Sequence, residues 1–280
     1  NDVASIEEDT PLLNFDVLAN DSAPVGETLT LTSAISESAA TITINEDGTL
    51  SYQGPSDFYG ADVVSYSIQD SQGRVSQAAV EITITPVNDD PIASSDVDAI
   101  AENGLIELEE DKSLLSDDLD VDGDTLAVSA IRAGALSEQG EDGTVGESLV
   151  GAYGTLTLNA NGNYSYAANA GAVEDLSAGT VVEDVFTYTV SDGALSSSAE
   201  LRISVTGVND APTAVSNVEA VAEDELIADK NLLINDSDID GDALSVSAVR
   251  SGALTATGTT GTIGSALSGT YGTLTLNANG

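Results

Sequence analysis

The chain has 280 residues, of which 48 are Asp or Glu and only 6 are Lys or Arg, so its formal net charge is −42. A charge of this size repels phosphate backbones and favours bound cations, which makes nucleic acid and anionic membranes poor partners. The chain has no Cys and no His. This excludes disulfides, thiolate chemistry, the commonest general base and the commonest ligand of transition metals.

Strands are predicted from the first repeat onwards by a period of two in the hydrophobic pattern. Apolar and polar residues alternate at 64–68 and again at 80–84. Alternation of this kind places one face of a strand in a core and the other in water. No apolar run reaches 18 residues, so no membrane-spanning segment is predicted.

The same pattern returns further along the chain, at 186–190 and 201–205. Between these regions, Thr-Leu-Thr-Leu at 155–158 is followed by Asn159-Ala160-Asn161-Gly162 and then by Tyr-Ser-Tyr at 164–166. Asn and Gly at the turn indicate a β-hairpin. Many short strands with regular turns predict an all-β chain of sandwich domains.

Internal repetition divides the chain. Val-Asn-Asp occurs at 87–89 and at 208–210, followed closely by Pro91 and Pro212. We therefore expect three repeats, at 1–87, 88–208 and 209–280. Residues 126–162 and 244–280 are identical at 24 of 37 positions. The third repeat stops at Gly280, which matches Gly162, so we expect a truncated domain whose parent chain continues.

Two acidic loops of the same pattern are the strongest candidates for a metal site. Asp-x-Asp-Gly-Asp occurs at 120–124 and at 238–242. Alternate side chains of an extended loop point the same way, so three carboxylates would converge, which is costly without a cation. Oxygen-only ligands suit Ca²⁺. The alternative is an acidic, solvated turn. The candidate ligands in these loops are Asp120, Asp122, Asp124, Asp238, Asp240 and Asp242.

Taken together, these motifs resemble a known family. The second repeat combines the acidic loop with Tyr-Gly-Thr-Leu-Thr-Leu at 153–158 and Phe-Thr-Tyr-Thr-Val-Ser-Asp-Gly at 186–193. This resembles the VCBS and bacterial cadherin-like repeats of large adhesins exported by type I secretion. The first repeat, with Glu-Asp-Thr at 8–10 and Val-Leu-Ala-Asn-Asp at 17–21, is similar to a shorter cadherin-like variant. It has Ser-Ala-Pro-Val-Gly at 22–26 in place of the acidic loop.

The resemblance implies tandem Ig/cadherin-like Greek-key β-sandwich domains arranged end to end, with Ca²⁺ as cofactor. It also implies an extracellular location at the bacterial cell surface and a part in cell adhesion and biofilm formation. Eukaryotic cadherins hold calcium with an Asp/Asn-rich linker and a Glu near the start of each domain. An Asx-turn before proline is the alternative reading of these linkers. The corresponding residues here are Asn88, Asp89, Asp90, Asn209, Asp210, Glu8, Glu102 and Glu223.

No catalytic constellation is present in the sequence. Without His or Cys no classical triad can form, and phosphate-binding loops are absent. Carboxylate pairs leave a glycosidase open on residue types, but with no Trp and 3 Phe the chain is poor in the aromatic platforms that sugars need. We therefore expect a non-catalytic spacer.

The expected partners are neighbouring repeats of the same chain, and other copies or surface glycans through distal modules. Two alternatives stay open. One is a polysaccharide- or protein-binding module, for which the Gly/Ser/Glu-rich insertion at 134–152 is the only candidate. The other is a matrix or filament protein that assembles laterally.

Overall fold

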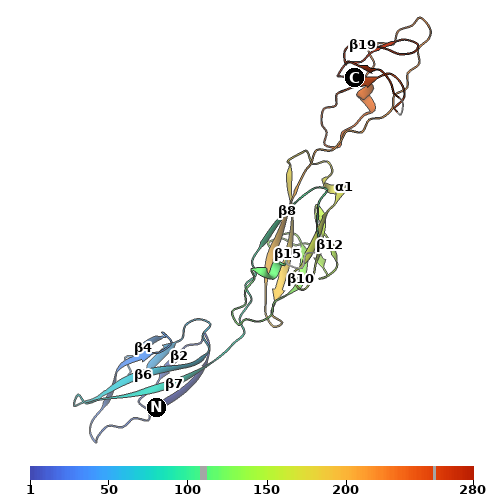
Figure 1. The fold of residues 1–280 in the computed structure, drawn as a ribbon. Coiled ribbons are helices and arrows are strands. Elements are labelled where there is room, and N and C mark those ends of the chain that lie inside the picture. Colours follow the sequence, from blue (N-terminus) through green and yellow to red (C-terminus); the bar gives the residue numbers. More distant parts are fainter. Residues whose placement is uncertain (108–111, 255–256) are drawn as a thin grey trace. The chain divides into compact units, whose positions relative to one another are not determined.

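The computed structural model describes residues 1–107, 112–254 and 257–280, and strands dominate it (Figure 1). The predicted all-β class is confirmed. The chain divides into two compact units, Asn1–Asp90 with Asp120–Asp124, and Pro91–Leu119 with Thr125–Gly280. In the described part of the chain, no helix has the length and apolar composition needed to span a membrane.

The first repeat is a sandwich of two sheets (Figure 1). One sheet has the order β1-β7-β6-β3, from Asp2–Glu7, Val75–Thr85, Gly60–Asp70 and Leu29–Ser36. The other has the order β2-β5-β4, from Leu12–Phe15, Leu50–Gln53 and Thr41–Ile44. β1 runs parallel to β7, whereas the other pairs are antiparallel.

The core of the first repeat comes from the alternation that the sequence shows. Val64, Tyr66 and Ile68 of β6 are buried, and their serine neighbours face outwards or lie at the margin. β7 contributes Val80 and Ile82 in the same way. The strands predicted at 64–68 and 80–84 thus lie within β6 and β7.

The second repeat follows the same plan, with β11 and β12 as additional strands. Its larger sheet has the order β11-β10-β15-β16-β8, and its smaller sheet the order β12-β13-β14-β9. β8 runs parallel to β16, as β1 does to β7. A 3-10 helix, η1 (Leu114–Ser116), and a short helix, α1 (Ala170–Val173), join the strands. The strands of the larger sheet are β11 (Asp142–Gly143), β10 (Ala127–Ala133), β15 (Val181–Ser191), β16 (Ser196–Thr206) and β8 (Asp96–Ala101). Those of the smaller sheet are β12 (Ser148–Val150), β13 (Gly154–Leu158), β14 (Tyr164–Ala168) and β9 (Leu105–Ile106).

The predicted hairpin forms between β13 and β14, with Leu158 paired to Tyr164. Gly162 has a φ of 82°, which an L-residue adopts only with strain. The insertion at 134–152 forms β11 and β12. Gly143 packs there against Leu149 and Ile131, so the insertion extends the sandwich.

Each complete repeat buries an aspartate that accepts a hydrogen bond from a core tyrosine. Asp184 is 2% exposed and accepts hydrogen bonds from Ala152 N (2.9 Å), Tyr153 N (3.0 Å) and the Tyr166 hydroxyl (2.9 Å). Asp62 has the corresponding place in the first repeat, and the Tyr52 hydroxyl donates to it at 2.8 Å. These bonds compensate for the burial of the charge.

The third repeat forms β17 (Val249–Arg250), β18 (Thr260–Gly261), β19 (Ala266–Ser268), β20 (Thr273–Thr275) and η2 (Leu232–Asn235) in its described part. Residues 217–222, which match β8, form no strand. β8 pairs with β16, and the 280 residues contain no third-repeat counterpart of β16. Tyr271 is fully exposed.

Candidate metal centre

The linker after β7, at 87–91, is called the first junction here, and the linker at 208–212 the second. One group of carboxylates comes together at the first junction. Glu8, Asp89 and Asp122 each place a carboxylate oxygen within 4.8 Å of the others. Glu8 directly follows β1 and is 5% exposed, and its Oε1 accepts a hydrogen bond from Val87 N at 2.6 Å. Asp89 N donates to Asp122 Oδ2 at 2.8 Å. Three separate segments of chain therefore meet at this group.

A second group shares Asp89. Asp9, Asp57 and Asp89 also place carboxylate oxygens within 4.8 Å of one another. Asp9 and Asp57 both have a φ of 56°, and Asp57 N donates to Asp9 Oδ1 at 3.3 Å. Asp89 is thus the residue common to two acidic groups.

The electrostatics of the first junction are unfavourable without a cation. Burial raises the pKa of Asp89, and the carboxylates of Asp57, Asp122, Asp9 and Glu8 raise it further. The ion pairs among the described residues involve other acids. Several like charges held this close favour a bound cation.

The Asp-x-Asp-Gly-Asp loop differs from the expected arrangement. Its three carboxylates form no group of their own among the described residues. Asp120 Oδ1 instead accepts hydrogen bonds from Asp122 N (3.0 Å) and Asp124 N (3.1 Å), and Gly123 has a φ of 79°. The loop closes as an Asx-turn around Asp120, which aims Asp122 at the linker. Asp124 stays exposed.

The second junction repeats the same hydrogen bonds. Asp238 Oδ1 accepts from Asp240 N (3.1 Å) and Asp242 N (3.3 Å), and Asp210 N donates to Asp240 Oδ2 at 2.7 Å. Glu102 is 1% exposed, and its Oε1 accepts from Val208 N at 2.8 Å. In the described structure these acids do not gather three oxygens within 4.8 Å.

Buried oxygens without hydrogen-bond partners test whether a metal fits. Four such carboxylate oxygens lie at the two junctions of the described chain: Asp89 Oδ2, Asp120 Oδ2, Glu102 Oε2 and Asp240 Oδ1. A buried charged oxygen with no partner is costly, and a hard cation with oxygen ligands removes that cost. The oxygen donors at the first junction, which also gather within 4.8 Å of one another, could therefore hold a cation such as Ca²⁺, whereas the second junction shares only the type of donor.

The remaining candidates lie outside these groups. Asp90, Asp242 and Glu223 are exposed and belong to no acidic group of the described residues. Asn88 and Asn209 are exposed, and their side-chain amides donate to the carbonyls of Asp89 and Asp210, at 3.1 and 2.8 Å. They shape the linkers and present no carboxylate.

Two residues of the first junction were not among the predicted ligands. Asp9 follows Glu8 directly. A pair of adjacent acids at the end of a strand is only a weak signal in the sequence for a metal ligand. Asp57 lies in a loop 32 residues before Asp89 in the sequence, between Pro55 and Phe58. Nothing in its local sequence separates it from an ordinary acidic turn, so only the fold reveals it.

A different acidic cluster, formed by Asp96, Asp117 and Asp118, lies near Tyr188 of β15. The Tyr188 hydroxyl lies 2.5 Å from Ser94 O and 2.7 Å from Asp96 Oδ2. Burial raises the pKa of Asp96 to about 6, and the nearby Asp117 and Asp118 raise it too, whereas the Tyr188 hydrogen bond lowers it. The hydroxyl has a single proton for these two acceptors, and a protonated Asp96 could donate to the hydroxyl oxygen instead, so the geometry suits a protonated Asp96.

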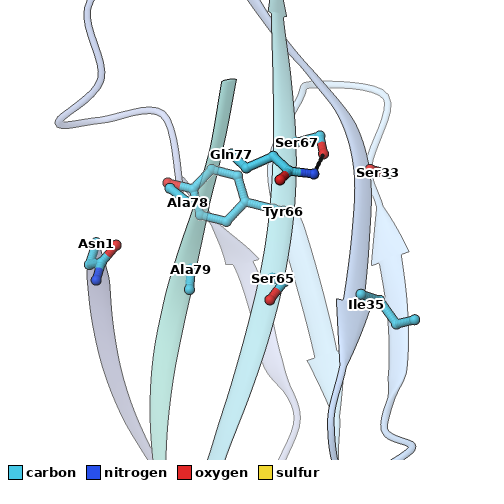
Figure 2. Close-up of a pocket in the computed structure, with 9 residues that line it drawn as sticks. All are labelled: Asn1, Ser33, Ile35, Ser65, Tyr66, Ser67, Gln77, Ala78 and Ala79. Atoms are coloured by element: carbon cyan, nitrogen blue, oxygen red, sulfur yellow. Dashed lines mark hydrogen bonds between the residues drawn. The ribbon is translucent and has the colours of Figure 1, made fainter. Parts of the chain in front are cut away.

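A hollow lies on the outer face of β3, β6 and β7, and Figure 2 shows its lining. The lining side chains are mostly small, and Gln77 Nε2 donates to Ser67 Oγ at 3.3 Å. The one aromatic residue is Tyr66, whose hydroxyl donates to the buried Asp2 at 2.8 Å. The hollow offers no aromatic platform to a sugar.

Comparison with protein families defines the class of the domains. Residues 88–207 match the bacterial cadherin-like domain and residues 208–280 the cadherin-like domain. Residues 1–83 match the bacterial Ig domain, where the sequence had suggested a cadherin-like variant. Each third of the chain thus matches a different domain model, and domains of these classes are typically non-catalytic. No curated protein sequence matched it.

Several solved structures are similar to parts of the chain at low identity and with TM-scores under 0.5. Human mucin-like protocadherin EC1-2 is 15% identical, over 74% of this chain and 96% of the other, with a TM-score of 0.39. Human CDH23 EC21-23 is 15% identical over 88% of this chain and 86% of the other, with a TM-score of 0.46. The endo-fucoidan hydrolase MfFcnA4 from glycoside hydrolase family 107 is 19% identical over 74% of this chain and 28% of the other, at 0.26.

Proposed function

We propose that this chain is a non-catalytic, calcium-stiffened extender region of a large adhesin on the bacterial cell surface. The observation that carries the proposal is the set of buried carboxylate oxygens that have no hydrogen-bond partner at the two repeat junctions. They lie where a linker, a strand end and an acidic loop meet, and oxygen-only sites of this kind suit Ca²⁺.

Calcium would stiffen the chain through these contacts. At the first junction an ion would be held by Glu8, Asp89 and Asp122, which come from a strand end, the linker and a loop. An ion shared by three segments ties them together, whereas without it their carboxylates repel one another. The same reasoning applies to Glu102, Asp210 and Asp240.

The domain composition supports a structural role. The matched domain classes are typically non-catalytic, and the sequence supplies neither His nor Cys. Near-duplicate domains joined by short linkers suit a spacer, since each unit adds length without adding a binding site. Adhesion and biofilm formation would then depend on distal modules, with neighbouring repeats as the direct partners of these domains.

The proposed location is extracellular, with export by type I secretion. It rests on the match to bacterial cadherin-like domains and on the likeness of the repeats to those of exported adhesins. The net charge of −42 is compatible with a medium that contains millimolar divalent cations. Polysaccharide binding receives less support because the hollow of Figure 2 has only one, internally bonded, aromatic ring.

Thermal unfolding tests the calcium requirement, since an ion that binds only the folded state raises its stability by mass action. We expect excess chelator to lower the melting temperature of the chain by several degrees. Asp122→Asn should weaken calcium binding and reduce that shift. Asp124→Asn is the matched control, because Asp124 lies in the same loop but outside the acidic groups. Equal melting curves with calcium and with chelator would refute the proposal.

A further inference from the structure

The first repeat leaves one edge of its larger sheet open. β3 is the last strand in the order β1-β7-β6-β3, and among the described strands it pairs with β6 alone. The corresponding strand of the second repeat, β10, is flanked on that side by β11, which the insertion at 134–152 supplies. In the third repeat, β18 likewise pairs with β17. The first repeat has no such insertion, so the edge of β3 stays uncovered.

The main chain of β3 directs hydrogen-bonding groups along this edge. Glu37, the residue after β3, donates its N–H to Val63 O at 3.2 Å and so faces β6. In an antiparallel ladder, successive residues direct their N–H and C=O groups alternately to one side and to the other. Counting back from Glu37, the groups of Ser36 and Ala34 therefore point towards the open edge. A further strand could pair with them there.

β3 lacks the features that protect the other edge strands of the two complete repeats. Charge and shortness are the usual protections of a free edge. β1 and β8 carry acids, and β2, β4, β9, β11 and β12 have four residues or fewer. β3 has eight residues and no charge, in a chain where 19% of the residues are charged. Its one protective irregularity is a bulge between Leu31 and Ser33.

The face beside this edge is uncharged as well. Ile35 is 70% exposed and lies at the hollow on the outer face of β3, β6 and β7. All the side chains that line the hollow are uncharged, among them Ser33, Ser65 and Ser67. Figure 2 shows Ser33 and Ile35 on the side of the hollow away from Asn1. A second acidic chain meets the least repulsion where the surface carries no acids.

We propose that β3 pairs with β3 of a second copy of this chain, edge to edge and antiparallel, around a twofold axis. Charge selects the second copy as the occupant. A basic partner would be attracted over the whole surface of a chain with a net charge of −42, and would gain nothing from its one long uncharged edge. Two β3 strands can pair without placing one acid of the strand opposite another. This contact goes beyond the spacer function, which needs no contact between chains.

The association should be weak and should depend on salt in a characteristic direction. Pairing through one strand edge buries a small interface, which is typical of transient contacts. The net charges of the two chains oppose the pairing, and salt screens that repulsion. Association should therefore strengthen as the ionic strength rises, whereas an interface held by ion pairs would weaken.

Sedimentation velocity of the 280-residue chain tests the pairing, over a series of protein concentrations in calcium buffer at low and at high NaCl. We expect a dimer whose fraction rises with concentration and with salt. Ile35→Glu should weaken the association by about tenfold, because each symmetric dimer contains the added charge twice. The matched control is Val3→Glu. Val3 is 74% exposed on β1, at the opposite edge of the same sheet, so this variant should associate as the native chain does.

Single cysteines locate the contact, since the native chain has none. Thr30 and Ser33 are exposed residues of β3, and an antiparallel pair brings the middle of one strand beside the middle of the other. Thr30→Cys or Ser33→Cys should form a disulfide-linked dimer under mild oxidation much faster than Val3→Cys.

Three results would overturn the inference: an association that Ile35→Glu leaves unchanged, one that Val3→Glu weakens equally, or equal cross-linking of all three cysteine variants. A chain that stays monomeric at every concentration and salt would also overturn it, and would leave the open edge to an extended segment of a different protein. None of these results bears on calcium binding at the junctions, so the proposed function is tested separately.

Discussion

At the residue scale, Asp96 gives the second repeat a pH dependence of its own. Its pKa is raised from 3.8 to about 6, chiefly by burial. Below about pH 4 the group is protonated in both the folded and the unfolded state. As the pH rises towards 6, the unfolded state releases the proton and the folded state does not. The free energy of unfolding therefore falls across this window, by at most about 3 kcal/mol.

Asp96→Asn removes that dependence. The variant should be more stable than the native chain at pH 7 and differ less from it at pH 4, as measured by calorimetric unfolding in chelator. The third repeat already has Asn217 at the corresponding position, where its amide donates to Val215 O at 3.1 Å.

Asp98→Asn is the contrasting control. Asp98 is paired with Lys112 and accepts from the Tyr164 hydroxyl at 2.7 Å, and its pKa is lowered despite the opposing effect of burial. Its stabilising contribution is present at neutral pH and lost in acid, so removing it should destabilise the repeat at pH 7. A gain in stability from Asp98→Asn, or none from Asp96→Asn, would contradict this assignment of charges.

At the element scale, the turn between β13 and β14 depends on a glycine. Gly162 has a φ of 82°, and a Cβ there would clash with Ser113 Oγ and Leu115. Gly179 has the same φ with nothing within 4 Å of an added Cβ. We expect Gly179→Ala to cost about 1 kcal/mol of unfolding free energy, from strain alone. Gly162→Ala should cost roughly 3 kcal/mol, because overpacking adds to the strain. Equal costs in calorimetry would refute the packing argument.

The strands could be predicted because alternation is a local property. Val64, Tyr66 and Ile68 are apolar, spaced by two, and buried, and the hairpin turn shows its Asn/Gly chemistry in the sequence. The parallel pairing of β1 with β7 was not predictable in this way, since it joins residues about 78 positions apart, such as Asp2 and Val80.

The candidate site was predictable only in part, for the same reason. Glu8, Asp89 and Asp122 stand in repeated motifs, so repetition identified them. Asp57 is brought to Asp89 by the closure of the sandwich, which no local pattern records. In the described structure the three carboxylates of the acidic loop form no group of their own, because the backbone N–H groups of Asp122 and Asp124 bond to the Asp120 carboxylate.

At the scale of the whole molecule, a net charge of −42 makes the chain repel itself. Self-repulsion extends such a chain but fixes no angle between its domains. The linkers that precede Pro91 and Pro212 are short, and proline restricts both itself and its predecessor. Calcium at the junctions would supply the remaining constraint.

Small-angle X-ray scattering of the 280-residue chain, with calcium and with chelator, tests this claim most directly. With calcium, the account predicts a stiff, elongated particle with a single well-defined maximum dimension. With chelator it predicts a broader distribution of dimensions, and Asp89→Asn should shift the calcium-bound profile towards that state. A profile that is identical in the two conditions, or one that shows a compact particle with calcium, would contradict the account.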